Sequence, residues 1–94
     1  MIRKTAATVF LLFFAAACAG LTGDRVVVTR AGEDLLKLRA GPGLGFRILM
    51  GLPDGTELYR HGCVTEVGQL WCEVSLADSP AVTGYVSADY LRPL

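Results

Sequence analysis

Glycine and proline divide the chain after residue 19 into short runs, and this division limits what the chain can form. All 11 glycines and all 4 prolines lie in that part. No window there has an apolar repeat of 3.6 residues over ten positions, so helices longer than one turn are not expected. The runs favour an all-β fold, a small barrel or sandwich of five to six short, mostly antiparallel strands. The expected strands are 25–29, 35–39, 48–52, 57–64, 70–76 and 83–86.

The first 17 residues have the pattern of a secretory signal peptide. Arg3 and Lys4 precede an uncharged run, 6–17, that ends in small residues. This run is shorter than the roughly 20 apolar residues that a transmembrane helix needs. The remainder is large enough for one small domain. The sequence therefore predicts a signal peptide at 1–17, an anchor cysteine with a short tether at 18–24, and one domain at 25–94.

Cys18 has two interpretations. The three alanines before it resemble the lipobox of bacterial lipoproteins, in which the cysteine becomes the lipidated N-terminus, although Ala15 stands where that box usually has Leu. The alternative is ordinary cleavage at a pair of small residues. An odd count of three cysteines favours lipidation, since Cys63 and Cys72 can pair and leave Cys18 over. We therefore expect an exported protein of the cell envelope, anchored to a membrane through Cys18 and facing the periplasm. A soluble periplasmic or secreted protein is the alternative.

The charge balance argues against a nucleic-acid partner. The chain has 9 basic and 9 acidic residues. Without the segment that carries Arg3 and Lys4, seven basic residues remain against nine acidic ones. A nucleic-acid-binding domain of this size usually has a basic excess, which is absent here.

Cys63 and Cys72 have the spacing of partners across a β-hairpin. If they lie opposite each other, the turn is Val67-Gly68 or the four residues 66–69. In an oxidising compartment this predicts a structural disulfide, which in the loop-entropy model stabilises the domain by about 2.5 to 3 kcal/mol. The spacing differs from Cys-x-x-Cys, and one histidine cannot complete a four-ligand metal site. No metal and no cofactor are expected.

The chain has no convincing catalytic constellation. His61 lies two residues before Cys63, but a Cys–His pair needs a free thiolate and an orienting third group. We expect His61 to be a lone surface histidine. The glycine-rich segment 41–45 is not followed by Gly-Lys-Ser/Thr or by a helix, so it is not a phosphate-binding loop. The sequence predicts that the protein is not an enzyme.

Four segments together resemble the bacterial SH3-like (SH3b) domain family. They occur in the family's order, and the resemblance spans most of the chain after the signal peptide. It implies a strongly bent, five-stranded barrel of the SH3 type with one short 3-10 turn near the C-terminus. The segments are Leu36-Lys-Leu-Arg-Ala-Gly-Pro-Gly with Phe46-Arg-Ile-Leu-Met-Gly-Leu, then Asp54-Gly-Thr-Glu-Leu, Leu70-Trp-Cys-Glu-Val and Gly84-Tyr-Val-Ser-Ala-Asp-Tyr-Leu.

The same resemblance implies where a ligand would bind. It places Trp71 and Tyr90 beside a ligand groove and makes the loop from Arg39 to Phe46 one wall of it. Rigid aromatic side chains suit peptide or sugar faces because they bury area at low entropic cost. A structural role in the core or at the barrel rim is the favoured interpretation of Phe46, and it is the open alternative for Trp71 and Tyr90. We expect a non-enzymatic module that recognises cell-wall peptide or glycan (peptidoglycan). The alternative is a protein–protein interaction module that binds another envelope protein.

Overall fold

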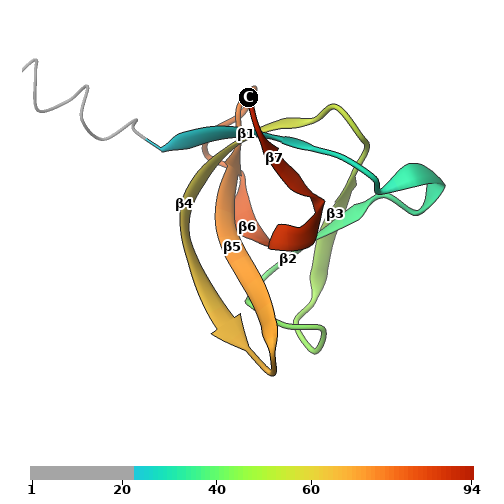
Figure 1. Cartoon of the computed structure of the whole chain (residues 1–94), viewed down its shortest axis with the longest axis vertical. Helices are drawn as coiled ribbons and strands as arrows, with labels where there is room; N and C mark the ends of the chain where they lie inside the picture. Colours follow the sequence, from blue (N-terminus) through green and yellow to red (C-terminus); the bar gives the residue numbers. More distant parts are fainter. Residues whose placement is uncertain (1–22) are drawn as a thin grey trace, which may run out of the picture.

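Seven strands, all paired antiparallel, form one sheet in the computed structural model, which describes residues 23–94 (Figure 1). Their order in the sheet is β3-β2-β6-β5-β4-β1-β7. Only two 3-10 turns interrupt the strands in the described part, and no helix there is long and apolar enough to cross a membrane. The predicted signal peptide and Cys18 lie outside the described residues. The elements are β1 (Asp24–Val28), η1 (Gly32–Asp34), β2 (Leu36–Arg39), β3 (Ile48–Leu52), β4 (Glu57–Glu66), β5 (Gln69–Leu76), β6 (Thr83–Ser87), η2 (Ala88–Tyr90) and β7 (Leu91–Pro93).

The all-β prediction is confirmed, with one more strand than expected. All six predicted strands are present within two residues of their expected ends, and η2 is the expected turn near the C-terminus. The additional strand, β7, pairs with β1 and places Leu91 opposite Val28 and Pro93 opposite Val26. Its three residues are too few to show an alternating pattern, and they include a proline. Because β7 lies at the edge of the sheet, the missing N–H of Pro93 is tolerated.

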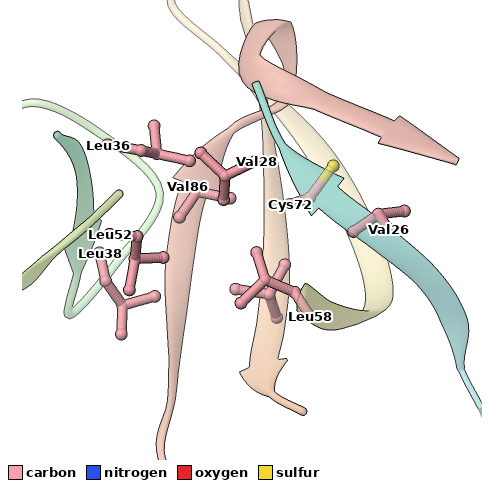
Figure 2. Packing of buried hydrophobic residues seen from close by; sticks show 9 residues of the cluster. Val26, Val28, Leu36, Leu38, Leu52, Leu58, Cys72 and Val86 are labelled. Atoms are coloured by element: carbon pink, nitrogen blue, oxygen red, sulfur yellow. The ribbon is translucent and has the colours of Figure 1, made fainter. Parts of the chain in front are cut away.

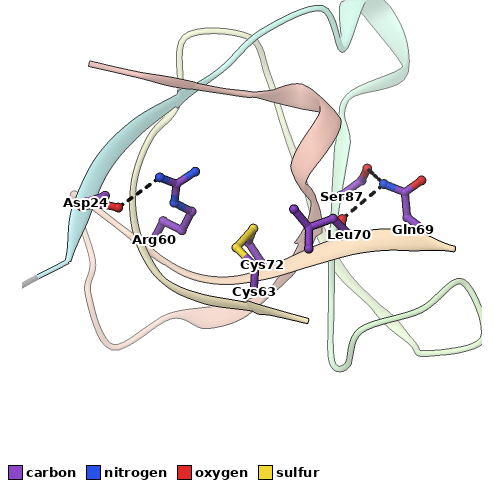
Figure 3. Close-up of a disulfide and its surroundings, with 7 residues drawn as sticks. All are labelled: Asp24, Arg60, Cys63, Gln69, Leu70, Cys72 and Ser87. Atoms are coloured by element: carbon purple, nitrogen blue, oxygen red, sulfur yellow. Dashed lines mark hydrogen bonds and ion pairs between the residues drawn. A yellow bond between two sulfur atoms is a disulfide. The ribbon is translucent and has the colours of Figure 1, made fainter. Parts of the chain in front are cut away.

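The β4–β5 hairpin has the predicted register. Cys63 pairs directly with Cys72, and their sulfur atoms form the predicted disulfide (Figure 3). The turn is Val67-Gly68, with φ values of 50° and 75°. Positive φ at both central residues is what a type I′ hairpin turn requires. The hairpin therefore combines a covalent bond between its strands with a turn that favours their twist.

The core follows from the alternation of side chains along each strand. Val26 and Val28 of β1 and Leu36 and Leu38 of β2 are buried, whereas Val27 and Lys37 between them are only partly buried. This is the period of two that a half-buried strand shows. The same face of the sheet collects the rest of the core, shown in Figure 2. The core consists of Val26, Val28, Leu36, Leu38, Leu52, Leu58, Cys72, Val74 and Val86.

Trp71 is buried but does not belong to this cluster. It precedes Cys72 on β5, so its side chain lies on the opposite face of the strand from the core. This position leaves Trp71 beneath the surface groove described next.

Candidate functional site

Two adjoining hollows form a groove on the surface of the domain. The larger has a volume of about 730 Å³ and the smaller about 320 Å³. Leu44, Trp71, Ser87 and Tyr90 line both hollows, which makes them one continuous surface. We call this surface the aromatic groove. Additional lining comes from Phe46, Glu66, Val67, Gln69 and Asp89 in the large hollow and from Arg30, Asp34, Leu35, Lys37 and Arg39 in the small one.

All four side chains that the sequence predicted for ligand binding line this groove. Trp71 and Tyr90 are at its centre, Phe46 lines the large hollow and Arg39 the small one. Trp71 is only 4% exposed, whereas Tyr90 is 37% exposed. Trp71 therefore supports the floor of the groove, and Tyr90 is the accessible aromatic side chain at its centre. Their role in binding stays a prediction.

The loop between β2 and β3 is held in place by Arg39 and Gly41. The Arg39 guanidinium donates hydrogen bonds to the carbonyls of Leu44 (3.2 Å) and Phe46 (3.1 Å). The Phe46 ring lies so close to Gly41 that a Cβ there would be 2.4 Å from its Cδ1 atom. Phe46 is 48% exposed, so one part of its ring rests on the loop and the other remains accessible. Arg39 thus stabilises the loop that forms one wall of the groove.

Backbone strain in residues 23–94 is concentrated at the groove. Three residues other than glycine have positive φ in that part of the chain, namely Arg30 (61°), Leu35 (60°) and Val67 (50°). All three line the groove. Such conformations are uncommon for residues with a side chain and cluster at functional sites when the surrounding structure holds them. Here the Arg30 side chain donates to the backbone carbonyl of Asp89 at 2.6 Å, which ties its strained segment to η2.

Comparison with known proteins identifies the domain. The family model of the bacterial SH3 domain matches residues 34–92. The chain belongs to the bacterial SH3 domain family. No curated protein and no solved structure matches the chain. Domains of this family are generally binding modules and are often associated with the cell wall.

In this bacterial SH3 domain, Gln69 joins the two sides of the large hollow. Its side-chain amide donates to Ser87 Oγ (2.8 Å), to the carbonyl of Leu70 (3.2 Å) and to Asp89 Oδ2 (3.4 Å). Figure 3 shows the first two of these contacts. Sequence reasoning missed Gln69, Ser87 and Val67 as groove residues. The sequence marks these residues only by their positions: Val67 lies in the turn between β4 and β5, Gln69 follows that turn, and Ser87 precedes η2.

The two hollows carry opposite charge. Glu66 and Asp89 line the large hollow, and no basic residue lines it. Arg30, Lys37 and Arg39 line the small hollow with a single carboxylate, that of Asp34. The ion pairs within the described part of the chain, Arg25–Glu57 and Arg60–Asp24, involve none of these groups.

His61 has a partner that the sequence did not reveal. Its Nε2 lies 2.6 Å from Ser75 Oγ across the β4–β5 pair. Ser75 is buried, and neither residue lines the aromatic groove. The pair therefore links β4 and β5 outside the aromatic groove. Residues 23–94 contain no group of three His, Cys, Asp or Glu side chains that could hold a metal ion.

Proposed function

We propose that this bacterial SH3 domain is a non-enzymatic binding module of the cell envelope that holds cell-wall peptide or glycan in the aromatic groove. The observation that carries the proposal is the position of the strained residues. Arg30 and Leu35, which lie outside the β4–β5 turn that requires the positive φ of Val67, both line this groove. Because strained residues cluster at functional sites, their position supports the groove as the binding site.

The groove is suited to binding because its parts are already ordered. Arg39 holds the loop that carries Phe46, and Gln69 joins the start of β5 to the end of β6. A preorganised surface loses little conformational entropy when it binds. Tyr90 and Phe46 offer accessible ring faces, and Trp71 supports them from below. Flat ligands such as peptide planes or sugar rings can stack on such faces.

The proposal includes export and lipidation of Cys18. The described fold begins with β1 at Asp24, six residues after Cys18. Six extended residues reach at most about 22 Å. A domain anchored in this way would face the periplasm close to its membrane, and its ligand would have to come within that distance.

Sedimentation with insoluble peptidoglycan tests the proposal. The full chain, oxidised and in a mild detergent, is compared with Tyr90→Ala and Phe46→Ala. Loss of an aromatic contact at the centre of an interface weakens binding by roughly tenfold. Tyr59→Ala is the matched control, because Tyr59 lies outside the groove and its ring contacts Arg25. Trp71→Ala is avoided, since removing so deeply buried a side chain can unfold the domain. Absence of binding by the folded wild type would contradict the wall ligand.

The second candidate function is binding of another envelope protein, and the exposed edge of the sheet favours it. β3 lies at one end of the sheet order, and Ile48, Leu49 and Met50 are each at least 40% exposed. An uncharged apolar edge strand can pair with a strand of a partner. Leu49→Arg would abolish binding of the partner protein at the β3 edge and leave wall binding intact. Tyr90→Ala would weaken wall binding and leave binding of the partner protein intact.

A further inference from the structure

We infer that the ligand of the aromatic groove is a peptide with two opposite charges. Its ammonium group would lie at the Glu66 and Asp89 end and its carboxylate at the Arg30 and Lys37 end. This inference rests on the proposed function, because it takes the aromatic groove as the binding site. It adds the chemical class of the ligand and the direction in which the ligand lies.

The carboxylates of the large hollow have no cation to balance them within the described part of the chain. Glu66 and Asp89 form no ion pair there. The one side-chain contact of Asp89 is with the neutral amide of Gln69, at 3.4 Å. Both carboxylates belong to exposed residues, so a ligand can reach them. An ammonium group is the complement that this end lacks.

The small hollow has an excess of positive charge, because Arg30, Lys37 and Arg39 line it with one carboxylate, that of Asp34. Lys37 Nζ donates to the backbone carbonyls of Asp34 and Leu35, and Arg30 donates to the carbonyl of Asp89. Carbonyl groups satisfy these donors but do not neutralise their charge. Arg39 is bound to carbonyls of its own loop in the same way, so its charge adds to that of Arg30 and Lys37. A carboxylate is the complement at this end.

The two ends stay separate although Arg30 and Asp89 are in contact. The Arg30 guanidinium binds the backbone carbonyl of Asp89 at 2.6 Å, and no ion pair forms between the two side chains. Asp89 therefore lines the large hollow with its negative charge, and Arg30 lines the small hollow with its positive charge. Between them lie Trp71 and Tyr90. An uncharged glycan offers hydroxyl groups but no complementary charge to either end, whereas a short peptide with free termini matches the charge of both ends and the aromatic centre.

Fluorescence of Trp71 provides the test, because it is the chain's single tryptophan and lies in the groove. The full oxidised chain is titrated with tetra-alanine that has free ends and with its N-acetylated, C-amidated and doubly blocked forms. We expect each block to weaken binding by about two- to fivefold, the effect of an exposed charge contact.

Charge variants assign the direction. In Glu66→Gln/Asp89→Asn, N-acetylation should no longer weaken binding, while C-amidation still does. In Lys37→Met, C-amidation should weaken binding less than it does in the wild type, while N-acetylation still weakens it fully. Glu73→Gln, on an exposed residue outside the groove, is the control and should respond to both blocks as the wild type does. Equal binding of all four peptides would overturn the inference, and so would a response to N-acetylation that persists in the Glu66/Asp89 variant.

Parallel sedimentation with peptidoglycan separates this inference from the proposed function. Wall binding that occurs without any preference among the four peptides would overturn the peptide inference and leave the proposed function in place. Peptides that bind in the expected direction, without wall binding, would support the inference and contradict the wall ligand. Absence of binding to both the peptides and the wall would overturn both.

Discussion

Gly41 is the position where one methyl group should disturb the wall of the groove. A Cβ at Gly41 would lie 2.4 Å from Cδ1 and 2.5 Å from Cε1 of Phe46, far inside van der Waals contact. Gly41 does not have a positive φ, so the backbone there can accept alanine. The effect of Gly41→Ala is therefore steric and concerns one aromatic ring. Because this ring is half-exposed, it can swing toward solvent instead of straining the core.

The magnitude follows from the area that the ring would expose. Complete burial of a phenylalanine side chain stabilises a protein by about 1.5 to 3 kcal/mol. Phe46 is 48% exposed, so losing its remaining contacts should lower the free energy of unfolding by about 1 kcal/mol. In a Phe46→Ala background the clash is absent. There Gly41→Ala should be neutral or stabilising by about 0.4 to 1 kcal/mol, because alanine reduces the freedom of the unfolded chain.

A double-mutant cycle measured by urea unfolding tests this reasoning. The four proteins are the wild type, Gly41→Ala, Phe46→Ala and the double variant, all with the disulfide intact. Gly45→Ala is the matched control, since a Cβ there would have no atom within 4 Å. If Gly41→Ala lowers stability equally with and without the Phe46 ring, the ring is not the cause and the argument is wrong.

Three further predictions concern turns and cross-links. Val67→Asn should raise the free energy of unfolding by about 1 kcal/mol, because asparagine accepts the left-handed conformation of this fully exposed residue. Val67→Thr is the control and should not raise the free energy of unfolding, because threonine is still β-branched. Replacing Cys63 and Cys72 together by alanine should lower the free energy of unfolding by about 2.5 to 3 kcal/mol. A reductant should lower the stability of the wild type by the same amount and leave the double alanine variant unchanged. Asp54 accepts hydrogen bonds from two backbone amides, at 2.8 and 3.3 Å. Asp54→Ala should therefore lower stability by about 1 kcal/mol and Asp54→Asn by less, measured by the same unfolding assay.

The strands were predictable because their signal is local. The run of three valines at 26–28, bounded by turn residues, indicates β1 without knowledge of its neighbours. β7 gives no such signal, since it is stabilised by pairing with β1 far away in the sequence. The order of the strands in the sheet is likewise a property of contacts between distant segments.

The site was predictable only in part, for a similar reason. The family motifs point to Trp71 and Tyr90, and the structure places both at the centre of the groove. The sequence does not show that Trp71 is almost fully buried. Nor does it show that the charges of Arg30 and Asp89 face different hollows, because this depends on a contact between residues 59 positions apart.

The strained turn and the disulfide lie in one hairpin, and their energies should offset each other. A left-handed valine costs about 1 to 2 kcal/mol, and the disulfide contributes about 2.5 to 3 kcal/mol. In the reduced protein the Val67 strain remains while the cross-link is gone. Val67→Asn should then recover about 1 kcal/mol of the lost stability, seen as a higher urea midpoint for the reduced variant than for the reduced wild type. Equal midpoints would mean that the turn relaxes on reduction, so that the disulfide itself holds Val67 in its left-handed conformation.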